Sequence, residues 1–298
     1  MAILQAYTNL IPVTLLQGVI YAFVALGIMI PFRLLSFPDL TAEGSFPLGA
    51  SVTAAILAAG ADPVSATILA IAAGFVAGAT TALIHRLFRL NTLLCGILVV
   101  TMLYSIDIRI MGKPNIPMFT YDDMFSILGN WSRSLGARIA LVSAIAIICT
   151  IALYCFLKTE MGLALRAVGA SQSMARAQGL STSYYVILGI GIAGALSALG
   201  GSILAQNQSF ADVNMGFGVL DNGLASLNVG EQLIGRQTLA RQLAAPLVGA
   251  VVYYQVVSFA LALGMQPSDL KLLTGLFVLA LLGLPLLRSR RTQSDALA

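Results

Sequence analysis

Two stretches of this 298-residue chain place acidic and amide side chains against or inside apolar runs, beside helix-breaking proline and glycine. A carboxylate at the centre of a bilayer costs about 3 kcal/mol and is kept where it faces a cavity or a bundle interior. Proline and glycine unwind a helix and free backbone groups to meet a solute or water. The candidate lining residues of a translocation path are Pro38, Asp39, Thr41, Glu43 and Gly44 in the first stretch, and Asp221, Asn222 and Gly223 in the second.

The two stretches, residues 34–50 and 214–235, fall one in each half of the chain. Two interrupted apolar segments in opposite halves are typical of a pathway near the middle of a membrane. A second interpretation stays open, in which Asp39 and Glu43 lie in a cytoplasmic loop and Asp221 lies near the opposite surface. The acids would then cap half-helices, since a helix N-terminus favours a carboxylate by up to about 1 kcal/mol.

A third stretch, residues 163–185, lies between two long apolar runs and reads LALRAVGASQSMARAQGLSTSYY, with two arginines and no acid or proline. We expect the preceding helix to end where Gly169 breaks it. Ser171 is then a suitable N-cap for a short helix over residues 172–178. Gly179 suits the left-handed C-terminal position. A helix of two turns is marginal alone, so this one must pack against something.

The elements that position these residues follow from composition. Hydrophobic residues make up 58% of the chain and charged residues 9%, with a mean hydropathy of +0.92. Soluble domains have about 25% charged residues. We therefore expect an all-α polytopic membrane protein forming one domain over residues 1–298, with eight or nine spans, two broken or re-entrant helices and pseudo-repeated halves. The apolar segments are 10–30, 44–59, 64–84, 93–110, 137–157, 184–205, 219–235, 244–264 and 270–287.

Basic residues in the short loops predict the orientation, because cytoplasmic loops carry the excess of Lys and Arg. With the N-terminus outside, eleven Lys and Arg residues lie inside and five outside. The C-terminus and the loop 158–183 are then cytoplasmic, and the loop 111–136 is extracytoplasmic. In that outer loop, Tyr121, Phe125, Leu128 and Trp131 recur at helical spacing, which predicts an interfacial helix serving as an anchor or as a docking surface for an external partner.

Several kinds of chemistry lack the residues that they need. His85 is the single histidine, so a multi-histidine metal site is excluded. The stretch at 112–114 lacks both the glycine and the Ser/Thr of a phosphate-binding loop. Neither a nucleophile–base arrangement nor a basic stripe for nucleic acid is present. Small residues four apart, as at Gly74 and Gly78 or along Gly189–Gly201, predict close helix packing.

The stretch GLALRAVGASQSMARAQGLS resembles the cytoplasmic coupling loop of ABC importer permeases of the branched-chain amino acid and ribose type. That loop reads G-x-x-x-R-A-x-G, then a short alanine-rich helix, then A-x-x-x-G. Where the family commonly has an acidic residue, this chain has Ser171 and Gln172. FPDLTAEGSFPLGA resembles the early broken-helix stretch of the same family. The similarity is greatest to permeases for tryptophan- or tyrosine-like amino acids, or for uncharacterised amino-acid import.

The resemblance implies a transport subunit rather than an enzyme, in the plasma (inner) membrane of a bacterium. It implies two cytoplasmic ATP-binding subunits that hold ATP and Mg, an extracytoplasmic solute-binding protein and a second permease copy, whereas this chain binds no cofactor itself. The implied ATPase-coupling residues are Gly162, Arg166, Ala167, Gly169, Ser171, Gln172, Ala175, Arg176 and Gly179.

The expected function is therefore that of a permease subunit moving a small solute, such as an amino acid, into the cytoplasm. The alternative is an ion- or proton-coupled secondary transporter, with Asp39, Glu43 and Asp221 as its coupling carboxylates.

Overall fold

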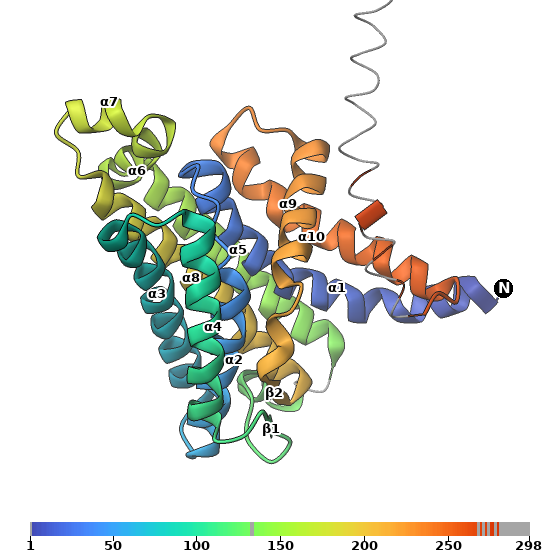
Figure 1. Ribbon diagram of the computed structural model, residues 1–298. Coiled ribbons are helices and arrows are strands. Elements are labelled where there is room, and N and C mark those ends of the chain that lie inside the picture. Colours follow the sequence, from blue (N-terminus) through green and yellow to red (C-terminus); the bar gives the residue numbers. More distant parts are fainter. Residues whose placement is uncertain are drawn as a thin grey trace, which may run out of the picture.

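The computed structural model describes residues 2–131 and 134–266 and the isolated residues 269, 272, 275, 276 and 279. Helices dominate this part of the chain (Figure 1). In chain order the elements are α1 (Ala2–Met29), the π-helix η1 (Ile30–Leu34), α2 (Ala42–Ala58), α3 (Pro63–Phe88), α4 (Thr92–Met111), β1 (Asn115–Pro117), the 3-10 helix η2 (Met124–Trp131), α5 (Leu135–Lys158), α6 (Glu160–Ala170), α7 (Gln172–Ala177), α8 (Thr182–Gln208), β2 (Phe210–Asp212), the 3-10 helix η3 (Val213–Gly216), α9 (Val219–Ile234) and α10 (Leu239–Ala262).

Six of the described helical segments are long and apolar enough to cross a membrane. They span Tyr7–Leu34, Pro63–Phe88, Thr92–Met111, Leu135–Lys158, Thr182–Gln208 and Leu239–Ala262. Helices α2 and α9, of 17 and 16 residues, coincide with the two interrupted segments and are shorter. The expected segment 270–287 lies almost entirely outside the described residues.

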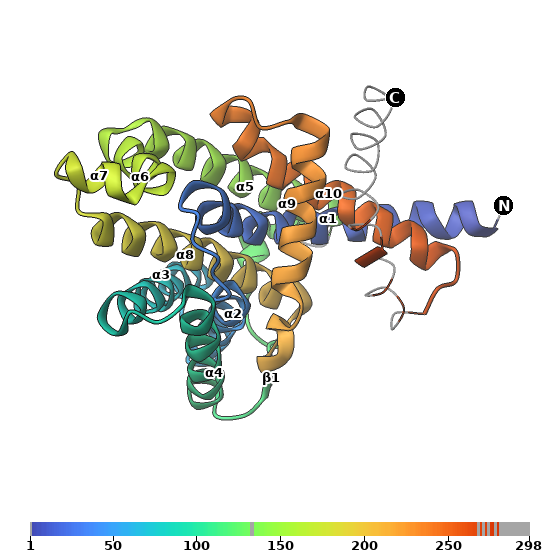
Figure 2. The ribbon, with the colours of Figure 1, turned by 45° about the horizontal axis from the view of Figure 1, so that its top comes forward.

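Helix α8 packs against α2 and α3 through small residues, as the spacing predicts. A Cβ added at Gly78 would lie 2.2 Å from the Ile190 carbonyl oxygen, and one at Gly201 would lie 1.9 Å from that of Phe46. Both distances are far inside van der Waals contact, so a larger residue would force the helices apart. Figure 2 shows α2, α3 and α8 grouped together, with α1 next to α8 and α9 next to α1.

The two ends of the bundle differ (Figure 1). We call the end with α6, α7 and the α9–α10 turn (residues 235–238) the α7 end. The opposite end, with β1 and β2, is the strand end. There, β1 and β2 pair antiparallel, with Ile116 opposite Ala211. The all-α expectation holds for the described residues apart from these two three-residue strands, which join the segments that follow α4 and α8.

The loop 111–136 does not form the regular amphipathic helix that its aromatic spacing predicts. Gly112 ends α4 with a φ of 69°, and the only helical turns that follow within the loop's described residues are those of η2. Gly129, with φ 55° and ψ −127°, kinks η2. Phe125 is fully buried in the core, and the Arg138 guanidinium lies 4.8 Å from its ring centroid. Its side chain therefore anchors the loop to the protein rather than to lipid.

The predicted helix end at Gly169 is correct within one residue, since α6 ends at Ala170, but this helix is not continuous with α5. The break falls at Thr159, whose hydroxyl accepts a hydrogen bond from Gly162 N and so begins α6. Gly169 lies inside α6, where an added Cβ would be 1.6 Å from the Leu34 carbonyl oxygen. The physical reason for glycine here is the contact of α6 with the segment that follows η1.

Candidate functional site

The two interrupted segments meet directly. The Gly218 backbone N–H donates to Glu43 Oε1 over 2.9 Å, across 175 positions of the chain. Gly218, with a φ of 80°, is the residue on which η3 gives way to α9, and Glu43 lies in the first turn of α2. A carboxylate at the N-terminus of α9 is favoured by the helix dipole. The capping interpretation of the acids therefore holds for Glu43, and the pair joins the two breaks.

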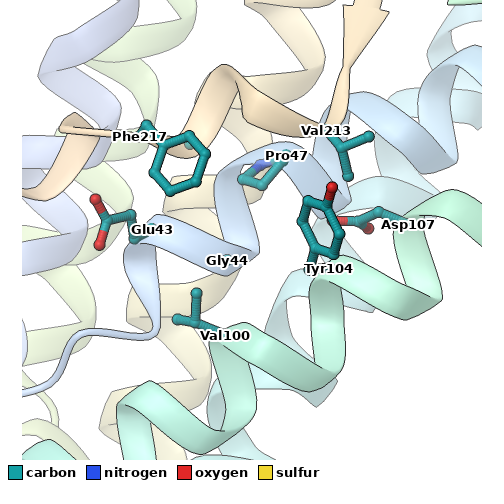
Figure 3. Close-up of a pocket in the computed structure, with 9 residues that line it drawn as sticks. Glu43, Gly44, Pro47, Val100, Tyr104, Asp107, Val213 and Phe217 are labelled. Atoms are coloured by element: carbon teal, nitrogen blue, oxygen red, sulfur yellow. The ribbon is translucent and has the colours of Figure 1, made fainter. Parts of the chain in front are cut away.

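A cavity of about 60 Å³ opens at this junction (Figure 3). The volume is well below the roughly 300 Å³ of a typical ligand pocket, and it suits a few waters or one small polar group. Glu43 and Asp107 lie at opposite ends of the cavity, with the Phe217 and Tyr104 rings between them in the view of Figure 3. Its lining residues come from α2, α4, η3 and the turn before α9: Glu43, Gly44, Pro47, Val100, Tyr104, Asp107, Val213, Gly216 and Phe217.

Two of the predicted path residues, Asp39 and Thr41, support the turn before α2 instead. Asp39 is buried and its Oδ1 accepts from the Thr41 backbone N–H at 3.0 Å. The Thr41 and Thr81 hydroxyl oxygens lie 2.7 Å apart, which ties this turn to α3. Pro38 is exposed and does not line the cavity. Of the first stretch, Glu43 and Gly44 therefore remain at the cavity.

The three predicted path residues of the second stretch lie next to one another on α9, and each has different surroundings. Asp221 is exposed. Asn222 Oδ1 accepts from the Tyr253 hydroxyl of α10 at 2.9 Å. Gly223 is buried, and a Cβ there would lie 2.4 Å from Ile28 Cδ1 of α1. None of the three lines the cavity.

Asp107 is the residue at this site that sequence reasoning missed. It is fully buried on α4 and lines the cavity. The signal was the one used for Glu43, an acid within an apolar run. Asp107 lies inside a continuous helix, so a search for acids beside helix-breaking proline or glycine did not select it.

An ion cluster links the second interrupted segment to η1 near the α7 end. Arg33 of η1 donates from Nε and Nη2 to the two oxygens of Glu231, each at 2.7 Å. Arg33 Nη2 also donates to Asn228 Oδ1 at 3.0 Å, and Arg236 Nε lies 3.4 Å from Glu231 Oε2. The Glu231 side chain is 5% exposed, so Arg33 balances a nearly buried charge. This bidentate pair holds α9 to the end of α1.

The predicted short helix at the α7 end is confirmed as α7. Ser171 caps it, because its Oγ accepts from Met174 N at 3.3 Å. Gly179 has a φ of 79°, and Leu180 N donates to the Ala175 carbonyl at 3.0 Å, which closes the helix. Ala175 is 3% exposed and packs into the core cluster that also contains residues of η1, α6 and α8. The helix is thus anchored by one small buried side chain.

The other predicted coupling residues lie in α6, in α7 and in the turn before α8. Gly162 is buried, and a Cβ there would be 2.3 Å from the Phe156 carbonyl oxygen. Arg176 Nε donates to Thr182 Oγ1 at 3.2 Å, which ties α7 to the start of α8. Met174, which the sequence analysis did not select, is 65% exposed. The exposed members of the predicted set are Arg166, Ala167, Gln172, Arg176 and Gly179.

Comparison with known proteins decides the family. The model of a family described as "Branched-chain amino acid transport system / permease component" matches residues 11–282. The chain belongs to this family. It is thus a multi-pass ABC-type permease of amino-acid transport, a transport subunit and not an enzyme.

Two relatives cover nearly the whole chain. A tyrosine transport system permease protein of Clostridioides difficile (strain R20291) is 42% identical over 266 residues, 89% of this permease and 88% of the relative. An uncharacterized protein of Rickettsia prowazekii (strain Madrid E) is 34% identical over 274 residues, 90% of this permease and 95% of the relative. No solved structure matches the permease.

Proposed function

We propose that this permease is the membrane subunit of an ATP-driven importer that takes an amino acid from a solute-binding protein and passes it into the cytoplasm. The observation that carries the proposal is α7, a capped helix at one end of the bundle that buries only Ala175 and presents Met174 outward. A separate ATPase moving α7 would act on the core cluster beneath it. The name of the Clostridioides relative supports tyrosine or a similar amino acid as the solute.

The proposed orientation places the α7 end, with residues 158–183, in the bacterial cytoplasm and the strand end, with residues 111–136, outside. The N-terminus is then outside and the C-terminus cytoplasmic, in a plasma (inner) membrane. Helices α2 and α9 act as the two broken crossing helices in the part of the chain that the structure describes. This arrangement agrees with the excess of Lys and Arg in the loops of the α7 end.

The proposed assembly contains a second permease copy, two cytoplasmic ATPases that bind ATP and Mg, and an extracytoplasmic solute-binding protein. The exposed Asp221 supports the second copy, because a carboxylate on an apolar bundle would otherwise face lipid. In this arrangement the path runs between the copies, past Phe217 and Asp221.

The test targets Met174, because Ala175 is packed inside and its replacement would disrupt α7 itself. Met174→Glu puts a charge on the exposed face of α7 and is expected to reduce co-purification of the co-expressed ATPase at least tenfold. Phe119→Glu is the control, since Phe119 is 75% exposed near the strand end. The control should leave ATPase binding unchanged.

Unchanged ATPase binding by the Met174→Glu permease would contradict the role of α7. Uptake that continues in proteoliposomes without ATP and stops when the proton gradient is removed would contradict the ATP-driven importer and favour the secondary transporter.

A further inference from the structure

We infer that the cavity between Glu43 and Asp107 is a binding site for the ammonium group of the solute. The inference rests on the proposed function, since it assumes that solute passes this junction. The cavity lies where the breaks of α2 and η3–α9 meet, and both carboxylates belong to its lining (Figure 3).

Asp107 carries the strongest indication that the site is incomplete without a ligand. Its side chain is fully buried, and neither carboxylate oxygen has a hydrogen-bond partner. The Ser51 hydroxyl on α2 uses its single proton in a bond to the Pro47 carbonyl at 2.8 Å. Buried polar groups in proteins are nearly always satisfied, and an unpaired buried carboxylate is costly. A donor entering the cavity would remove that cost.

The charge of the lining selects a cation. Of the nine lining residues two are acidic and none is lysine or arginine. Glu43 Oε1 accepts a hydrogen bond from the Gly218 N–H. This bond holds the negatively charged carboxylate at the end of the cavity opposite Asp107. An ammonium group has three donors and no acceptor, which matches the two unpaired oxygens of the Asp107 carboxylate. The α-carboxylate of an amino acid would be repelled inside the cavity, so it must stay at the opening together with the side chain.

The size and the rim of the cavity define the rest of the ligand. A volume of about 60 Å³ admits the ammonium group but not an amino-acid side chain, which must remain at the opening. Phe217 is 70% exposed and Tyr104 45% exposed, so two aromatic rings flank that opening. Such rings attract an ammonium group through their faces and pack against an apolar or aromatic body. The ligand class is therefore a primary amine with an apolar or aromatic side chain.

The experiment measures equilibrium binding of radiolabelled tyramine to the full-length permease in lipid nanodiscs. Unlabelled L-tyrosine, which has the ammonium group, should compete, whereas 3-(4-hydroxyphenyl)propionate, which lacks it, should not. Asp107→Asn keeps the shape of the side chain and removes its charge, and it should weaken tyramine binding at least tenfold. Asp62→Asn is the matched control, because Asp62 is an exposed cap of α3 that asparagine replaces well.

A second variant protects the test against a folding defect in Asp107→Asn. Phe217 is largely exposed, so Phe217→Ala should fold normally and weaken tyramine binding three- to tenfold. The inference is overturned by the absence of saturable tyramine binding, by equal competition from the propionate, or by unchanged affinity in both variants. If ATPase association and ATP-driven uptake persist in that case, the ammonium site alone is wrong. Loss of ATPase association in the unaltered permease would instead contradict the proposed function.

Discussion

The α6–α7 segment and the cavity at the helix breaks are built from opposite kinds of contact. Helix α7 is held by bonds between near neighbours, such as Ser171 to Met174, and by one buried alanine. The cavity is closed by residues far apart in the chain, with Glu43 bound to Gly218. A segment held by local bonds can shift or fray without unfolding the bundle, whereas the breaks lie within the core. The local contacts of α7 suit a helix that a partner ATPase moves. The long-range contacts around the cavity suit a solute path of fixed shape.

The largest expected effect is at the contact between α6 and the end of η1. Gly169→Ala would place a methyl group 1.6 Å from the Leu34 carbonyl oxygen, and no rotamer can relieve this clash because the atom belongs to the backbone. We expect a loss of about 3 kcal/mol of stability. Thermal unfolding of the detergent-purified permease measures it.

Gly136→Ala is the control for that substitution, because Gly136 lies in the first turn of α5 with nothing within 4 Å of an added Cβ. It should leave the melting temperature unchanged or slightly raised, since alanine favours helix. Equal melting temperatures for the two variants would show that α6 does not bear on the first break.

The next-largest expected loss of stability distinguishes the two arginines that contact Glu231. Arg33→Ala removes both of the 2.7 Å bonds to a nearly buried carboxylate and should cost about 2 kcal/mol of stability. Arg236→Ala removes a longer contact from a side chain that is 60% exposed and should cost well below about 1 kcal/mol. Unfolding of both variants under identical conditions gives the ranking, and a reversed ranking would contradict the assignment of Arg33 as the holding partner.

The smallest effect is local. Ser171→Ala removes the cap of α7 and should cost that helix about 1 kcal/mol, seen as faster amide exchange over residues 172–178 with little change in global unfolding. Ser181→Ala is matched to it, because Ser181 begins α8 without a side-chain cap bond. Faster exchange at the start of α8 in Ser181→Ala, equal to that of α7 in Ser171→Ala, would contradict the difference between these two serines.

The same difference explains what the sequence could predict. Apolar runs located α1 to α5 and α8 to α10, and Ser171 and Gly179 bounded α7, because spans and caps depend on residues within a few positions. Pairings between distant segments leave no such local signature. The contact of Glu43 with Gly218, the burial of Asp107 and the approach of Gly169 to Leu34 therefore emerged only from the fold. Asp221 was chosen as an acid in a glycine-interrupted apolar segment, and the structure leaves it exposed and away from the cavity.

The most direct test of the account asks whether α7 controls the opening at the breaks. The three native cysteines, Cys95, Cys149 and Cys155, are replaced, and Phe217→Cys introduces a single thiol at the cavity opening. The labelling rate with a membrane-impermeant maleimide is then measured for the assembled transporter with and without ATP and vanadate. The account predicts a rate that changes severalfold on nucleotide trapping, and a change that disappears when Met174→Glu is added. An equal rate in all states of the assembled transporter would contradict it.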